Sequence, residues 1–111
     1  MGAFNRLLLK ELLCPACNAL HDWIIQFKYG DCWQHDYVLQ DELKWEGNDE
    51  GDPSARIVLV EGIAEDDCQA CNEEVYARIF VDNNRIVAAS LVVERIWFTS
   101  EHEGEYIVIN K

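Results

Sequence analysis

The pentapeptides CPACN (residues 14–18) and CQACN (residues 68–72) are two copies of one pattern, and they decide the fold expected of this 111-residue chain. Each copy has two cysteines separated by two residues and followed at once by asparagine. A Cys-x-x-Cys turn can direct both thiolates at one metal ion because the backbone between them curls around it. Two such turns supply the four ligands of a tetrahedral site. The predicted ligands are Cys14, Cys17, Cys68 and Cys71.

The asparagine that ends each copy supports this interpretation. A metal-binding turn of this kind, a zinc knuckle, generally ends in a residue with positive φ, and asparagine tolerates that conformation best after glycine. Asn18 and Asn72 hold this position, and Pro15 stiffens the first turn. The sequence therefore predicts one structural Zn²⁺ per chain, bound between two facing knuckles.

With their flanking segments, the two pentapeptides resemble those of zinc-ribbon and rubredoxin-like proteins, whose twin knuckles join two hairpins over one metal. This chain departs from that pattern in three ways: asparagine replaces the usual glycine, the second copy lacks proline, and the insert between the copies is long. The stretch IQFKYGDCWQHDY (residues 25–37) is more loosely similar to small uncharacterised bacterial proteins with the same twin-knuckle plan. That similarity implies a fold and no activity.

Other uses of the paired cysteines stay open. Iron in the same cage would make the protein an electron carrier, as the rubredoxin resemblance implies. A thiol redox site of the thioredoxin type normally follows a βαβ pattern, which this sequence lacks. Two disulfides would require an oxidising compartment, whereas cysteine pairs in a reducing compartment are more often metal ligands.

Alternating hydrophobicity predicts a mainly β fold with little helix, a single antiparallel domain over residues 1–111. Every second side chain is apolar from Trp23 to Tyr29 and again from Val75 to Val81, the period of a half-buried strand. Asn83 and Asn84, which tolerate positive φ, predict a hairpin after the second run. Further strands are expected in residues 4–13, 37–39, 56–63 and 85–93, with a final hairpin of residues 95–99 and 106–110. Residues 46–54 are rich in turn formers and include Pro53.

A formal net charge of −12 narrows the classes of partner. Binding to nucleic acid or to anionic lipid needs a cationic surface, so neither is expected. No stretch reaches the roughly 18 apolar residues that span a membrane. The leucine run near the start is interrupted by Lys10 and Glu11 before it makes a signal segment. We expect a cytoplasmic protein, and a basic protein partner suits its charge.

The four tryptophans divide into two pairs. Trp23 and Trp97 lie on runs that are expected to face inward, whereas Trp33 and Trp45 flank an irregular stretch. The predicted partner-binding residues are Trp33, Trp45, Asp49 and Glu50. Because four cysteines would close the shell of the metal, we expect no enzyme. The sequence indicates an interaction module, such as an immunity protein that neutralises a toxin, or an adaptor.

Cys32, His35 and His21 are further candidate ligands outside the pairs. Cys32 and His35 form a Cys-x-x-His pattern, and His21 follows Cys17 by four residues. Each could substitute for a ligand, and Cys32 with His35 could form a nucleophilic dyad if Asp31 or Asp36 oriented the imidazole. We favour a simpler interpretation, in which Cys32 fills the core and the histidines make local contacts.

Overall fold

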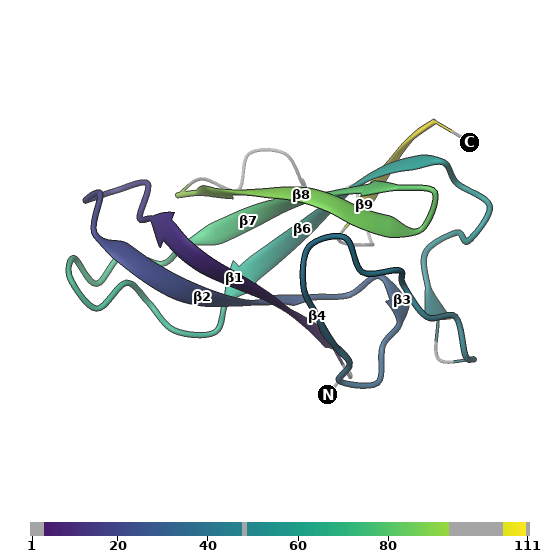
Figure 1. Cartoon of the computed structure of the whole chain (residues 1–111), viewed down its shortest axis with the longest axis horizontal. Helices are drawn as coiled ribbons and strands as arrows, with labels where there is room; N and C mark the ends of the chain where they lie inside the picture. The colour runs from purple at the N-terminus through teal and green to yellow at the C-terminus, as the bar shows by residue number, and fades with distance from the viewer. Residues whose placement is uncertain (1–3, 48, 94–105, 111) are drawn as a thin grey trace.

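The computed structural model describes residues 4–47, 49–93 and 106–110 (Figure 1). These residues contain nine β-strands and no helix. This confirms the mainly β prediction. The strands are β1 (Asn5–Leu13), β2 (Leu20–Phe27), β3 (Gly30–Asp31), β4 (Asp36–Tyr37), β5 (Asp49–Glu50), β6 (Ile57–Ala64), β7 (Tyr76–Asp82), β8 (Arg85–Val92) and β9 (Tyr106–Asn110). Within these residues, no helix has the length and hydrophobicity that spanning a membrane requires.

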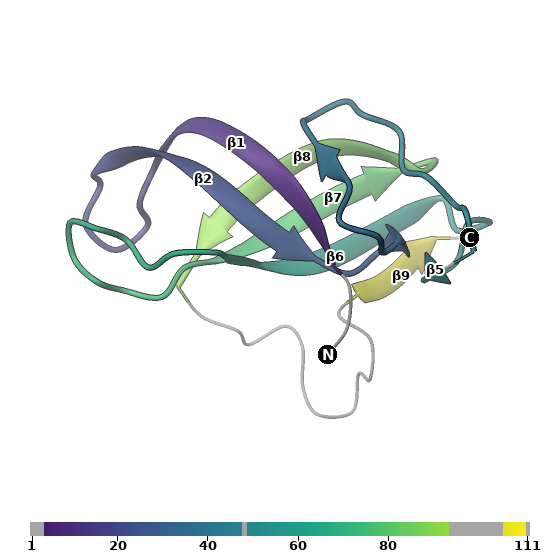
Figure 2. The same ribbon diagram turned by 90° about the horizontal axis from the view of Figure 1, so that it is seen from below.

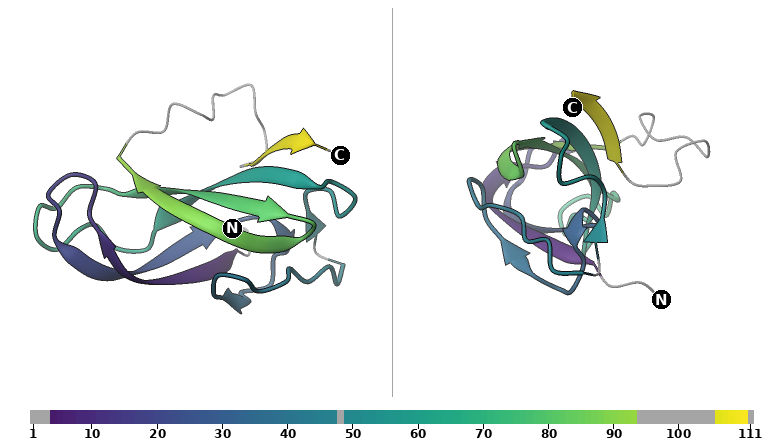
Figure 3. Two further views of the ribbon diagram at one scale, coloured as in Figure 1. Left: turned by 45° about the horizontal axis from the view of Figure 1, so that its top comes forward. Right: turned by 90° about the vertical axis from the view of Figure 1, so that its right-hand side faces the viewer.

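Seven of the strands form one curled sheet in the order β4-β1-β2-β6-β7-β8, with β9 added to β6 (Figure 3). All its pairs are antiparallel except β1 with β4. Its main parts are two long hairpins, β1–β2 and β6–β7, which the pairing of β2 with β6 joins side by side. β3 and β5 make a separate two-stranded sheet.

The junction between the hairpins depends on Gly62. Residues Ile25–Phe27 of β2 pair with Gly62–Ala64 of β6, in the antiparallel sense. A Cβ atom at position 62 would clash with the side chain of Ile25 and lie 3.0 Å from the carbonyl oxygen of Gln26. Glycine therefore lets the two strands approach closely enough to pair, which brings both hairpins into one sheet.

The alternating runs supply the core as expected. Trp23, Ile25, Phe27 and Tyr29 are all buried, and the alternate side chains of β7 lie beneath them in the same apolar cluster. Complete burial of a large apolar side chain contributes about 1.5–3 kcal/mol to the free energy of folding. The ring of Tyr29 packs edge-on against Trp45, with centroids 5.4 Å apart. Its hydroxyl donates a hydrogen bond to the carbonyl of Asp52 at 3.0 Å.

Two asparagines make the turn between β7 and β8, as predicted. Asn83 and Asn84 have φ of 50° and 65°, the conformation that a two-residue hairpin loop needs. The backbone amide of Asn83 donates to the carbonyl of Arg56 at 2.7 Å, which ties the turn to the start of β6. The turn sets the pairing of Asp82 with Arg85 and of Val81 with Ile86, and a bulge between Phe80 and Val81 shifts the register beyond them.

Residues 38–43 close one end of the curled sheet. β4, which precedes them, pairs with β1, and the amide of Gln40 donates to the carbonyl of Ile86 in β8 at 2.6 Å. The amide of Ile86 in turn donates to Asp41 at 2.9 Å. This segment therefore bridges the two edge strands. Beyond it, towards the knuckles, an apolar cleft of about 340 Å³ separates β1 from β8.

Two expectations need adjustment, and a third falls partly outside the described residues. Residues 49–50 form the short strand β5 inside a stretch expected to contain only turns. The strand expected at residues 37–39 lies at Asp36–Tyr37 and pairs in parallel with β1. Residues 95–99 and Trp97 lie outside the described residues, and so does the turn of the expected final hairpin. β9, at the expected position, pairs with β6.

Candidate metal centre

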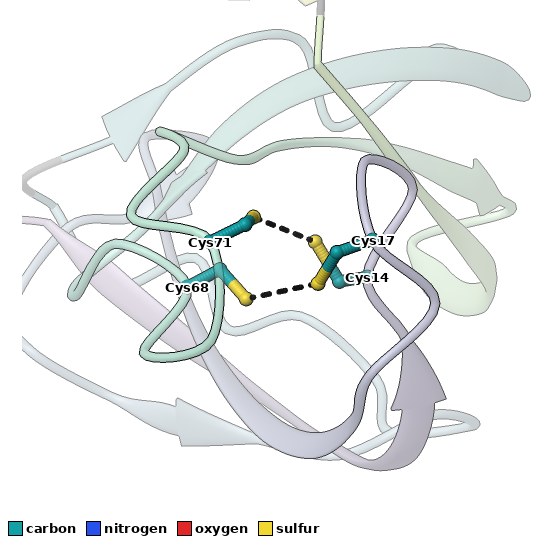
Figure 4. A group of neighbouring side chains, drawn as sticks. All are labelled: Cys14, Cys17, Cys68 and Cys71. Atoms are coloured by element: carbon teal, nitrogen blue, oxygen red, sulfur yellow. Dashed lines mark hydrogen bonds between the residues drawn. The ribbon is translucent and has the colours of Figure 1, made fainter.

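Both knuckles are tips of long hairpins at one end of the molecule. The first joins β1 to β2 and the second joins β6 to β7. Because β2 and β6 are antiparallel neighbours, the start of β2 and the end of β6 lie at the same end of the sheet. The two tips consequently lie side by side (Figure 2), and their cysteines face one another across the gap between them (Figure 4).

The two knuckles share one backbone conformation. Asn18 and Asn72 have φ of 60° and 61°, the positive values predicted for the residue after the second cysteine. The amide of Asn18 donates to the carbonyl of Cys14 at 2.8 Å, and the amide of Asn72 donates to the carbonyl of Cys68 at 2.7 Å. Both turns therefore close by the same hydrogen bond.

A second backbone hydrogen bond fixes the base of each turn. The amide of Cys14 donates to the carbonyl of Ala19 at 2.8 Å, and the amide of Cys68 donates to the carbonyl of Glu73 at 3.0 Å. In the first knuckle, the amide of Ala16 also lies 3.4 Å from the sulfur of Cys14, as a donor. Amides directed at sulfur stabilise a thiolate, which is the form that binds metal.

Two sulfur–sulfur distances across the gap between the knuckles match those of a tetrahedral zinc site. Cys14 Sγ lies 3.8 Å from Cys71 Sγ, and Cys17 Sγ lies 3.7 Å from Cys68 Sγ. Four Zn–S bonds of about 2.3 Å place the sulfurs of a tetrahedron about 3.8 Å apart. All four sulfurs lie within 4.8 Å of one another, and none is in a disulfide. The four predicted ligands thus form one cluster that fits a single ion, zinc or iron.

The thiols of this cluster differ in acidity. Burial tends to raise the pKa of Cys68, but hydrogen bonds from the backbone of Cys71 and Ala70 outweigh it and lower the pKa to about 6. A backbone hydrogen bond from Glu73 favours the thiolate of Cys71, but burial and the neighbouring thiols raise its pKa to about 12. Cys68 is therefore favoured as a thiolate, the form that binds metal.

His21 is a neighbour of the cluster rather than one of the four clustered ligands. Its Nε2 lies 3.5 Å from Cys68 Sγ, and its ring packs edge-on against Trp23 with centroids 5.6 Å apart. A hollow of about 210 Å³ adjoins this histidine, lined in part by Asp66 and Gln69. Sequence reasoning expected a local contact for His21, and the distant partner follows from the approach of the two hairpin tips.

A bulge interrupts β1 just before the first knuckle, and the sequence did not predict it. The register with β2 shifts between Leu9 and Leu12, and Glu11 has a φ of 54°. The amide of Glu11 donates to Asp22 Oδ1 at 3.0 Å, and Trp23 Nε1 donates to the carbonyl of Leu12 at 3.0 Å. Side chains of β2 thus satisfy backbone groups that the bulge removes from the strand ladder.

Cys32 and His35 do not join the four-cysteine cluster. Cys32 is buried, and its thiol donates to the carbonyl of Gly30 at 3.4 Å, which agrees with a core-filling role. His35 Nε2 lies 2.8 Å from Asp31 Oδ2. The imidazole is therefore directed at a carboxylate.

The predicted partner-binding residues lie in different surroundings. Trp33 is 69 % exposed, whereas Trp45 is half-buried against the core and its Nε1 is buried without a hydrogen-bond partner. Asp49 is exposed in β5, and the side chain of Glu50 lies outside the described atoms. Their role in binding stays a prediction.

Comparison of the chain with protein-family models, with curated proteins and with solved structures finds no match in any of the three. The resemblance to zinc-ribbon proteins is therefore carried by the four clustered cysteines and by the strand–knuckle–strand arrangement on each side of them.

Proposed function

We propose that the protein is a non-catalytic interaction module in which one structural Zn²⁺ fixes the two hairpin tips and an acidic surface binds a basic protein. The observation that carries this proposal is the cluster of four cysteine sulfurs, all within 4.8 Å of one another, two pairs of which lie 3.7 and 3.8 Å apart. A catalytic zinc keeps one coordination position for water, whereas four thiolates fill all positions of a tetrahedral ion. Such a site supports structure and not hydrolysis.

The case for a partner comes from charge and from one aromatic side chain. The net charge of −12 favours rapid encounter with a cationic surface. Trp33 exposes 69 % of its surface, and exposed tryptophans often become the buried anchors of an interface. The pairing of β3 with β5 places Asp49 opposite Asp31, two residues from Trp33. The exposed Trp33 and the acidic residues Asp31 and Asp49 therefore lie in the same region of the molecule.

Two kinds of partner suit this surface. A cationic nuclease toxin would make the protein an immunity protein, and a basic protein without toxicity would make it an adaptor. The same acidic surface would bind either partner, so an experiment must distinguish the immunity protein from the adaptor.

Capture of a partner with matched variants makes this separation. Tagged wild type, Trp33→Phe and Trp33→Ala are used at low salt in extracts of the native host. We expect wild type and Trp33→Phe to retain one basic protein that Trp33→Ala loses. Growth rescue by co-expression with that protein indicates immunity, and a partner without toxicity indicates an adaptor. Equal capture by all three would contradict the role of this surface.

A second candidate function is a rubredoxin-like electron carrier or thiol redox protein that uses the same cysteines. The exposure of Cys17 favours it, because an exposed sulfur ligand brings the metal within reach of a redox partner. Anaerobic purification with iron analysis and a visible spectrum tests this function. An iron-loaded red protein would support it, and a colourless zinc protein would exclude iron-based electron transfer.

A further inference from the structure

A second group of metal-binding side chains lies near the start of β1, at the end remote from the knuckles. His35 Nε2 lies 2.8 Å from Asp31 Oδ2 and 3.7 Å from Glu46 Oε1. One ligand atom from each of the three residues lies within 4.8 Å of the others. The four-cysteine centre contributes no residue to this group.

We propose that Asp31, His35 and Glu46 form a second metal site, which binds one divalent transition-metal ion through an imidazole nitrogen and two carboxylate oxygens. Three protein ligands leave the remaining coordination positions to water or to an external ligand. The site is thus of the open kind, in contrast to the closed four-cysteine centre. It does not depend on the proposed function.

The distances between the donor atoms suit an ion. Metal–nitrogen and metal–oxygen bonds of about 2.1 Å place adjacent ligand atoms about 3.0 Å apart in an octahedron and about 3.4 Å apart in a tetrahedron. The separations of 2.8 and 3.7 Å lie on either side of these values. Small rotations of the Glu46 side chain, which is 60 % exposed, would complete the geometry.

The backbone of the site is already held in place. The amide of Asp31 donates to the carbonyl of Lys44 at 2.7 Å, and Glu46 follows two residues later. The amide of His35 donates to Asn5 Oδ1 at 3.1 Å. The carbonyl of His35 accepts a hydrogen bond from the amide of Arg6 at 2.9 Å. Pre-ordered ligands reduce the entropy lost when an ion binds.

The charges of the group favour a cation. Two carboxylates converge on one imidazole, and the Asp31 side chain is only 7 % exposed in a chain that is strongly acidic overall. A divalent ion bound between the three side chains would be attracted to both carboxylates.

The donor set also selects the type of ion. The only thiol within this segment, that of Cys32, is directed at the carbonyl of Gly30. Nitrogen and oxygen donors suit Mn²⁺, Fe²⁺ and Zn²⁺, whereas soft ions prefer thiolates. Manganese is therefore a probe that distinguishes this site from the four-cysteine centre.

Titration with Mn²⁺ tests the proposal. Protein that has first been loaded with one zinc is titrated while the electron paramagnetic resonance signal of free aqueous Mn²⁺ is recorded. We expect one Mn²⁺ to bind per chain without displacing the zinc. Glu46→Gln should raise the Kd at least about tenfold, because one charged oxygen donor is lost. His35→Gln should weaken binding similarly.

A matched control removes the same kind of charge elsewhere. Glu42 is 65 % exposed and lies 3.9 Å from Arg85, so Glu42→Gln should leave the Kd within about twofold. Zinc content and circular dichroism should be equal in all four proteins. Absence of Mn²⁺ binding to the wild type at millimolar concentration would overturn the proposal. Equal Kd values for Glu46→Gln and Glu42→Gln would do the same.

Discussion

Asn18 and Asn72 have the same left-handed backbone conformation and make the same hydrogen bond, each to the carbonyl of the first cysteine in its own knuckle. Their φ values differ by a single degree, 60° against 61°. The repeat seen in the sequence is therefore a repeat of structure. Each asparagine turns its chain so that two sulfurs face the opposite knuckle.

Substitutions at Asn72 test this conformation. Asn72→Gly should leave the free energy of unfolding nearly unchanged, because glycine adopts positive φ without strain. Asn72→Val should lower it by about 1–2 kcal/mol, since a branched side chain is strained there. Urea denaturation of the zinc-loaded protein measures both values. Gln69→Ala, an exposed change in the same knuckle, serves as control, and equal stability of the valine and glycine variants would show that the turn does not need this conformation.

Loss of a cysteine ligand should have a far larger effect than loss of the fifth cysteine. Binding of a structural zinc contributes on the order of 10 kcal/mol to folding, as much as the whole stability of a typical domain. Cys14→Ser and Cys71→Ser should therefore unfold or aggregate. Cys32→Ser should be nearly neutral because serine can make the same hydrogen bond to Gly30. Equal damage from Cys32→Ser, measured by thermal unfolding, would show that the ligand set is wrong.

Zinc binding should release protons. Burial and neighbouring thiols raise the pKa of Cys71 to about 12, and the pKa of Cys17 is also raised, so both are protonated thiols near pH 7.5 without metal. Because zinc binds thiolates, its entry must displace both protons, and its affinity must fall as pH falls. An indicator dye in weak buffer should register at least two protons per zinc at pH 7.5. Fewer than one proton would contradict four-thiolate binding.

Alkaline pH should weaken the fold through Tyr29. Burial raises the pKa of its phenol to about 12, against about 10 in an unfolded chain. The unfolded state therefore loses this proton first, and the free energy of unfolding should fall as pH rises from 10 to 12. Urea denaturation across this range measures the slope. Tyr29→Phe should make it shallower, and an identical slope in that variant would show that Tyr29 does not cause it.

The sequence predicted those parts of the fold that depend on neighbouring residues. The knuckles follow from the order of Cys and Asn, the turn at Asn83 and Asn84 from two residues that accept positive φ, and the inward faces from alternation. Each of these features is encoded within a few residues. For this reason the four cysteines of the cluster could be predicted from the sequence.

Contacts between distant segments were not predictable in this way. The bulge at Glu11 is stabilised by side chains of β2, and residues 38–43 are held by hydrogen bonds from the amide of Gln40 to the carbonyl of Ile86 and from the amide of Ile86 to the carbonyl of Asp41. The group of Asp31, His35 and Glu46 forms because the chain returns past β3 after residue 43. No local pattern marks Glu46 as a partner of His35, since only tertiary packing brings them together.

X-ray absorption at the zinc edge, together with elemental analysis of the purified protein, tests the central claim most directly. The account predicts about one zinc per chain with four sulfur neighbours at about 2.3 Å and no nitrogen or oxygen in the first shell. Substitution of Cys32 should leave the spectrum unchanged, because its sulfur lies outside the cluster. A protein without bound metal, or a zinc with nitrogen or oxygen ligands at about 2.0 Å, would contradict the four-cysteine centre.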